Sequence, residues 1–248
     1  MKTERVMLPQ LIADYTEATR QAEKFGFLVR DTELQAEQIA SLTSLKDRIK
    51  EIKYAAIRAK DERAANILFH LQCGLNAQIS FLRVWIHLKE GKFYRAWDSL
   101  VDTQEYISIA MRSDENGVGL EQFLERLRRV EEVVFPGYRL YNSWGVVMSG
   151  GKCSICGRAF SECDHIEGLV YWGRLCVRAA AKFIRMDHVA LVDEPRDRRC
   201  VITEITTDDG YFRDYMTWKK TKPAGKKEQG VAGKMTAKIF DFNMLEID

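Results

Sequence analysis

Three of the six cysteines and one of the four histidines of this chain lie within residues 152–168, KCSICGRAFSECDHIEG. Cys153, Cys156, Cys163 and His165 follow the spacing C-x2-C-x6-C-x-H. Thiols and imidazoles at this density are typical of a tetrahedral zinc site, because zinc takes four such ligands in structural sites. The segment therefore predicts a local fold that a bound Zn2+ ion holds together.

The C-x2-C-G sequence is a tight turn that delivers two ligands. Cys153 and Cys156 flank the bend, and Gly157 follows them. Glycine accepts the positive φ that such a turn needs, and this lets backbone amides face the sulfurs. We expect this turn to form the first half of the metal site.

The second half of the site comes from Cys163 and His165, which are two positions apart. Both side chains reach one metal only if Asp164 points away from it. Four protein ligands leave no position for water, so the predicted site is structural rather than catalytic. Cys176, in YWGRLC, is an alternative to His165 as the fourth ligand.

Composition sets broad limits on this chain. Its 248 residues are 46% hydrophobic and 10% aromatic, which is enough for a core in one large or two small domains. The formal net charge is +2, so no global field indicates nucleic acid or an acidic membrane. The first residues, MKTERVMLPQ, lack a signal-peptide apolar region, and no run of eighteen apolar residues occurs. We expect a cytoplasmic protein without membrane association, whose thiols stay reduced.

The first 135 residues carry apolar side chains at alternating spacings of three and four, which predicts amphipathic helices. The stripes run over 8–25, 32–60, 68–86, 93–111 and 120–130, with a loop expected at 114–119. Asp31 or Thr32 is expected to cap the second helix, and Gly91 to end the third. Long helices joined by short links pack as antiparallel hairpins.

After Pro136 the sequence becomes rich in β-branched and aromatic residues. We expect strands over 138–149, 188–195 and 200–205, and a hairpin that turns at Trp172-Gly173. The predicted fold class is α+β: an all-α bundle of antiparallel hairpins over 1–135, then a small, zinc ribbon-like antiparallel β module over 136–210. Structural zinc contributes about 10–16 kcal/mol of apparent binding free energy, so the metal is expected to stabilise this module. Residues 211–248 are expected to be a flexible basic segment with a short apolar end.

The string C-S-I-C-G-x5-C-x-H-I-x-G-x2-Y-x-G-x2-C, followed by VALVDEP, runs from Cys153 to Pro195. It resembles a Cys/His motif of phage- and prophage-encoded proteins, in which the motif precedes a VSLV-x-x-P strand, as in relatives of prohead proteases. The residues upstream of the motif are helical in pattern, so the resemblance implies a phage- or mobile-element-linked setting and carries over no activity.

An enzymatic interpretation of the same residues has less support. The C-x2-C pair upstream of Asp164-His165-Ile166 echoes HNH endonucleases, in which the histidine activates a water. The interval from Cys156 to Asp164 is too short for the strand that separates the two parts there, and a second C-x2-C-H is missing from the sequence. Phosphate-binding, dinucleotide-binding and nucleophile-elbow motifs are also missing. We therefore expect no catalytic residues and no small-molecule substrate.

The C-terminal region is locally basic. From Lys219 to Lys238 it holds seven lysines against one acid, Glu228, and aromatic residues precede it. Basic residues beside aromatic ones grip phosphate backbones and stack bases, although a solvated linker has the same composition. The residues expected to contact nucleic acid are Arg196, Arg198, Arg199, Lys219, Lys220, Lys222, Lys226 and Lys227.

Two functions from different classes fit these features. The first is a non-enzymatic adaptor, in which a helical scaffold and a zinc-pinned module bind protein partners. The second is a nucleic-acid-binding zinc protein that uses the basic residues.

Overall fold

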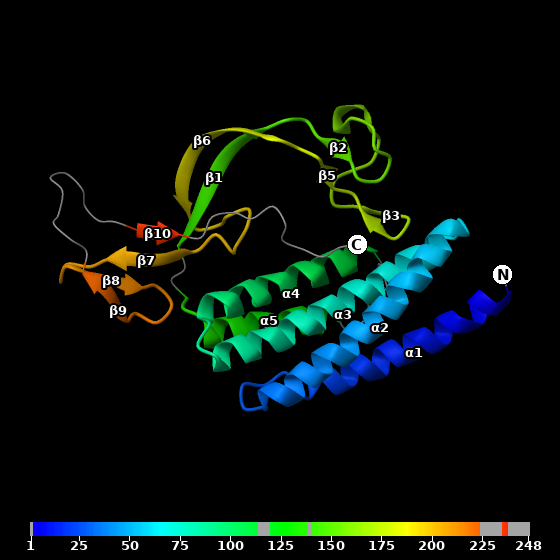
Figure 1. Cartoon of the computed structure of the whole chain (residues 1–248), viewed down its shortest axis with the longest axis horizontal. Coiled ribbons are helices and arrows are strands. Elements are labelled where there is room, and N and C mark those ends of the chain that lie inside the picture. The colour runs from blue at the N-terminus through cyan, green and yellow to red at the C-terminus, as the bar shows by residue number, and fades with distance from the viewer. Residues whose placement is uncertain (1, 114–119, 138–139, 224–234, 238–248) are drawn as a thin grey trace. The chain divides into compact units, whose positions relative to one another are not determined.

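The computed structural model of the chain describes residues 2–113, 120–137, 140–223 and 235–237. Within these residues the chain forms five α-helices followed by short antiparallel sheets (Figure 1). The expected α+β class, with the helices first, is confirmed. The loop expected at 114–119 lies outside the described residues.

The helices agree with the apolar stripes. They are α1 (Lys2–Glu23), α2 (Thr32–Arg58), α3 (Glu62–Lys89), α4 (Phe93–Ser113) and α5 (Leu120–Val134). Asp31 is the N-cap of α2, because its carboxylate accepts hydrogen bonds from the amides of Glu33 and Leu34. Gly91 has a φ of 69° between α3 and α4, a conformation that glycine adopts without strain.

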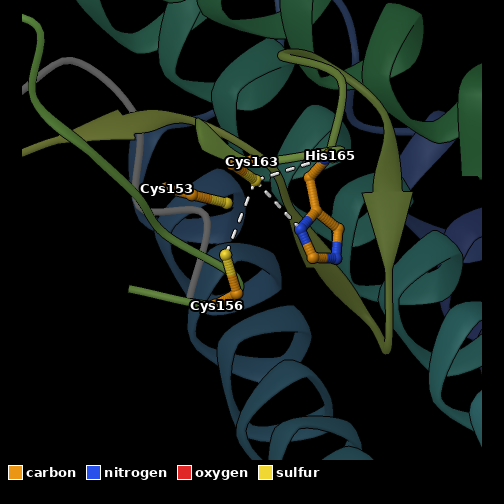
Figure 2. Close-up of side chains that lie close together, drawn as sticks. All are labelled: Cys153, Cys156, Cys163 and His165. Atoms are coloured by element: carbon orange, nitrogen blue, oxygen red, sulfur yellow. Dashed lines mark hydrogen bonds between the residues drawn. The ribbon is translucent and has the colours of Figure 1, made fainter. Parts of the chain in front are cut away.

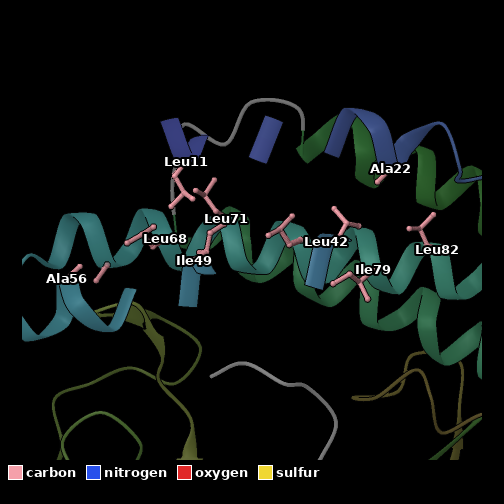
Figure 3. Close-up of a cluster of buried hydrophobic side chains, with 11 residues drawn as sticks. Leu11, Ala22, Leu42, Ile49, Ala56, Leu68, Leu71, Ile79 and Leu82 are labelled. Carbon is pink, nitrogen blue, oxygen red and sulfur yellow. The ribbon is translucent and has the colours of Figure 1, made fainter. Parts of the chain in front are cut away.

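Helix α3 is the centre of the helical packing, since it contacts α1, α2 and α4. Its side chains are buried around nearly its whole circumference, which is why its sequence is apolar beyond a single stripe. Figure 3 shows one core cluster that α1, α2 and α3 build together. Its members are Leu11, Ala22, Leu42, Ile49, Ala56, Ala65, Leu68, Leu71, Leu75, Ile79 and Leu82.

A close contact fixes α1 against α3. An alanine Cβ at Gly74 would lie 2.2 Å from the hydroxyl oxygen of Tyr15, so the tyrosine occupies the notch that this glycine leaves. Burial raises the pKa of the Tyr15 hydroxyl to about 12. Glycine within a helix costs about 1 kcal/mol relative to alanine, and here it admits a large aromatic side chain.

The chain divides into two compact units. One comprises the residues up to Arg128 together with Gly150–Ala181, and the other comprises Arg129–Ser149 and the residues that follow Ala181 as far as Met244. The segment that carries the cysteines therefore packs with the helices. The domain boundaries expected at 135 and 210 remain a prediction that the parts on either side fold independently. Limited proteolysis would test this prediction.

The second unit holds two sheets. A two-stranded ribbon pairs β1 (Tyr141–Met148) with β6 (Phe183–Val192). A four-stranded sheet has the order β10-β7-β8-β9, formed by β7 (Ile202–Thr206), β8 (Tyr211–Asp214), β9 (Lys220–Pro223) and β10 (Met235–Ala237). Strands lie within each of the ranges expected at 138–149, 188–195 and 200–205, but with other bounds: β6 begins earlier, at Phe183, and ends at Val192, and β7 begins at Ile202. Three strands lie in the segment 211–248 that was expected to be flexible, namely β8, β9 and β10, and its described residues are therefore largely part of a sheet. Residues 224–234 and 238–248 lie outside the described residues.

Among the helices in the described part of the chain, none combines the length and the hydropathy that a bilayer crossing requires.

Candidate metal centre

Short strands frame the cysteine segment. Strand β2 (Lys152–Cys153) pairs with β5 (Arg178–Ala179), and β3 (Val170–Tyr171) pairs with β4 (Arg174–Leu175). A single 3-10 turn, η1 (Phe160–Glu162), lies between the first pair of cysteines and Cys163. These pairings close the segment on itself, so ligands from 153 to 165 meet in one place.

The expected turn at Cys153 and Cys156 is confirmed. Gly157 has a φ of 73°, and its amide donates to the Cys153 carbonyl at 2.9 Å. The amide of Ile155 donates to the Cys153 Sγ atom at 3.4 Å. Backbone amides that face a sulfur stabilise its thiolate form, which is the form that binds a metal.

Four donor groups meet at this turn (Figure 2). The ligand atoms of Cys153, Cys156, Cys163 and His165 all lie within 4.8 Å of one another. The Cys163 Sγ atom lies 3.5 Å from the Cys156 Sγ atom and 3.2 Å from His165 Nδ1. The side chain of Asp164 is 99% exposed, so it points away from the cluster as the spacing required. The cluster could hold a metal ion.

The thiol pKa values follow from the same contacts. Burial opposes ionisation of Cys153, but hydrogen bonds from the amides of Cys156 and Ile155 outweigh it and lower the pKa of this thiol to about 7. The amide of Arg158 lowers the pKa of the Cys156 thiol. Burial raises the pKa of the Cys163 thiol to about 11. Two of the three thiols are therefore predisposed to the thiolate form.

The ring of His165 is oriented by an aromatic neighbour. It stands edge-on to the ring of Tyr171, with 4.6 Å between the ring centroids. The Tyr171 hydroxyl accepts a hydrogen bond from the amide of Ile166 at 3.2 Å. Strand β3 thus holds the imidazole with Nδ1 toward the sulfurs.

The β3–β4 hairpin is attached to α3. Trp172 and Gly173 have φ values of 53° and 64°, as in a type I′ turn, which confirms the expected hairpin. The Gly173 amide donates to Asn66 Oδ1 at 2.7 Å, and the Trp172 amide donates to Glu62 Oε1 at 3.2 Å. An alanine Cβ at Gly173 would lie 2.7 Å from the Ala65 carbonyl oxygen. The sequence predicted this turn, but it contained no signal for its contact with α3.

A second contact joins the same segment to α4. The guanidinium of Arg112 donates to the Gly168 carbonyl at 3.0 Å. Gly168 follows His165 by three residues and has a φ of 86°. Helices α3 and α4 thus hold the chain on both sides of Tyr171, whose ring contacts His165. The metal site and the helical packing are physically linked.

Two of the three arginines expected to contact nucleic acid form ion pairs within the protein. Arg199 is 7% exposed, and its guanidinium binds Asp197 at 2.8 Å. Arg198 forms an ion pair with Glu131. Arg196 is exposed. Two of the three arginines therefore stabilise the second unit from within.

The lysines expected at the same surface are exposed but partly neutralised. Lys220 Nζ lies 2.9 Å from Asp209, and Lys222 Nζ lies 2.8 Å from Glu204. Lys219 is exposed beside them. Lys226 and Lys227 lie outside the described residues.

The chain was compared with known protein families, curated proteins and solved structures. No protein family, no curated protein and no solved structure showed significant similarity to this chain.

Proposed function

We propose that this protein is a zinc-binding adaptor whose metal is structural. The convergence of three thiols and one imidazole within 4.8 Å carries the proposal. Such a soft donor set suits Zn2+ in a tetrahedral arrangement, and it fills the coordination sphere with protein groups. The metal would fix residues 150–181 in the shape that meets α3 and α4. It would thereby hold this segment and these two helices as one platform for a protein partner.

Metal analysis tests this function. The full chain, purified without chelator from a reducing cytoplasm, is expected to contain one zinc per chain. Cys153→Ser and Cys156→Ser are expected to lose the metal, because each removes a thiolate ligand. Cys73→Ser is the matched control, since Cys73 is a buried thiol of α3 that does not belong to the cluster. Metal-free wild-type protein, or zinc retained in both site variants, would refute the structural zinc site.

A nuclease assay separates the adaptor from an HNH-like enzyme. Because His165 Nδ1 lies among the sulfurs, the imidazole serves as a ligand and is not free to act as a base. The wild-type protein is expected to leave plasmid DNA and RNA intact with magnesium or manganese. Cleavage by the wild type that His165→Ala abolishes would favour the enzyme.

The phage- or mobile-element-linked setting is part of the proposal and rests on the motif from Cys153 to Pro195. It predicts that the gene lies beside phage structural or packaging genes. A neighbourhood of housekeeping genes would contradict the phage- or mobile-element-linked setting, but it would not affect the proposed zinc site.

Nucleic-acid binding is the second candidate, and the β8–β9 surface favours it. Tyr211 and Trp218 are exposed there, with Lys220 Nζ 4.5 Å from the Tyr211 ring centroid and the Arg213 guanidinium 5.9 Å from that of Trp218. Aromatic rings beside cations stack bases and bind phosphates.

Fluorescence anisotropy with single-stranded DNA and RNA at two salt concentrations tests this candidate. Binding would weaken steeply with salt and would fall in Trp218→Ala. Trp172→Ala, which removes an exposed tryptophan of the metal segment, is the control. Equal binding by the two variants, or none by the wild type, would argue against this surface.

A further inference from the structure

A fifth possible metal ligand, the thiol of Cys176, lies beside the four donors of the candidate metal centre. Cys176 follows β4, and its side chain is fully buried at 0% exposure. Its amide donates to the Leu169 carbonyl at 2.8 Å, and its carbonyl accepts from the Gly168 amide at 2.8 Å. These bonds place it across the hairpin from the residues that follow His165. Its Sγ atom lies 3.8 Å from the Cys153 Sγ atom.

This separation has the size expected for two ligands of one zinc ion. With Zn–S bonds of about 2.3 Å at tetrahedral angles, two bound sulfurs are about 3.8 Å apart. The Cys153–Cys176 distance of 3.8 Å therefore matches an edge of a zinc tetrahedron, and more closely than the 3.5 Å between Cys156 and Cys163 does. A disulfide needs about 2.0 Å between the sulfurs, so the pair is in its reduced form.

The segment thus presents five donors for the four positions that zinc offers. Cys153 and Cys156 share one turn whose amides face their sulfurs, so both are held in place. Cys163 bridges that turn to His165 through contacts of 3.5 Å and 3.2 Å. The fourth position has two candidates, since His165 lies beside Cys163 and Cys176 lies beside Cys153.

We propose that Cys176 is an alternative fourth ligand that replaces His165 when the imidazole leaves the metal. The ligands then change from three thiolates and one imidazole to four thiolates, without release of zinc. This inference rests on the proposed zinc site and adds to it an exchangeable position. A competing explanation is that Cys176 is a small core residue, as buried cysteines often are.

Cobalt(II) titration of the full chain tests the exchange. Bound cobalt reports its ligands, because the thiolate charge-transfer absorption grows with the number of bound sulfurs. His165→Ala is expected to bind one cobalt per chain with a stronger absorption than the wild type, as for four thiolates. Cys176→Ser is expected to bind one cobalt with the wild-type spectrum. Each single change should weaken affinity by less than about 100-fold, and the double variant by more.

The controls separate folding from ligation. Cys73→Ser removes a buried thiol of α3 and should leave affinity and spectrum unchanged. Circular dichroism establishes that each variant keeps its helices, and Cys176→Ala replaces Cys176→Ser if a buried hydroxyl unfolds the segment. His165→Ala that keeps its helices and loses cobalt would overturn the exchange, as would cobalt retained by the double variant. A wild-type protein that binds no cobalt or zinc would instead refute the zinc site itself.

Discussion

Replacing Gly173 by alanine tests whether the β3–β4 hairpin is held against α3. Gly173 has a φ of 64°, a left-handed conformation that costs an alanine about 1–2 kcal/mol. The new Cβ would also lie 2.7 Å from the Ala65 carbonyl oxygen and 3.0 Å from its carbon, both of them backbone atoms of a helix. Overpacking of this kind costs about 1–3 kcal/mol. We expect a destabilisation of about 2–5 kcal/mol in total, the sum of these two costs.

Gly91→Ala is the matched control. Gly91 belongs to the same unit and has a φ of 69°, but an alanine Cβ there would meet no described atom within 4 Å. The control therefore carries the backbone cost of about 1–2 kcal/mol without the clash. The difference of about 1–3 kcal/mol measures the contact with α3 and corresponds to a melting temperature about 2–12 °C lower for Gly173→Ala.

Thermal unfolding followed by circular dichroism, with zinc present, gives the two melting temperatures. Hydrogen exchange at Glu62 to Asn66 gives a local readout, since detachment of the hairpin should increase exchange in the first turns of α3. Equal melting temperatures for the two variants, together with unchanged exchange at these residues, would show that the hairpin does not depend on α3.

Two further outcomes follow from the described contacts. Arg199→Ala is expected to destabilise the second unit by about 3–5 kcal/mol, because it leaves the buried carboxylate of Asp197 without its cation. Replacing the exposed Arg196 by alanine should change the stability little. Equal denaturation midpoints for the two variants would contradict the pairing. In metal-free protein at pH 7, iodoacetamide is expected to modify Cys156 well before Cys73. Cys156 is exposed, and its lowered pKa enlarges its thiolate fraction. Burial raises the pKa of the Cys73 thiol to about 12. Peptide mapping by mass spectrometry measures the modification of both cysteines. If added zinc fails to protect Cys156, this would argue against Cys156 as a zinc ligand.

Much of the helical part could be predicted because its signals are local. The alternating spacing of apolar residues requires no knowledge of the rest of the chain, and it placed all five described helices. The cap at Asp31 depends on amides two and three residues away. The same holds for the turn at Cys153, Cys156 and Gly157, whose geometry is set within five residues.

Charge was harder to interpret from sequence. The arginines and lysines that suggested a phosphate-binding surface include four that pair with carboxylates: Arg198, Arg199, Lys220 and Lys222. Asp209 and Glu204 precede their lysine partners by 11 and 18 positions, and Glu131 lies 67 positions from Arg198. A count of charges along the chain cannot reveal these three pairs, because folding brings them together. Asp197, in contrast, lies only two positions before its partner Arg199.

The sequence by itself determined the helices, the turn at Cys153 and Cys156 and the outward position of Asp164, since each follows from the geometry of a few consecutive residues. Tertiary structure decided what these elements contact. It placed Gly173 against Asn66, 107 positions earlier, and brought Cys176 within 3.8 Å of Cys153. Contacts at such separations arise when whole elements pack, and the free energy that selects them is shared among many side chains. No short pattern in the sequence records them.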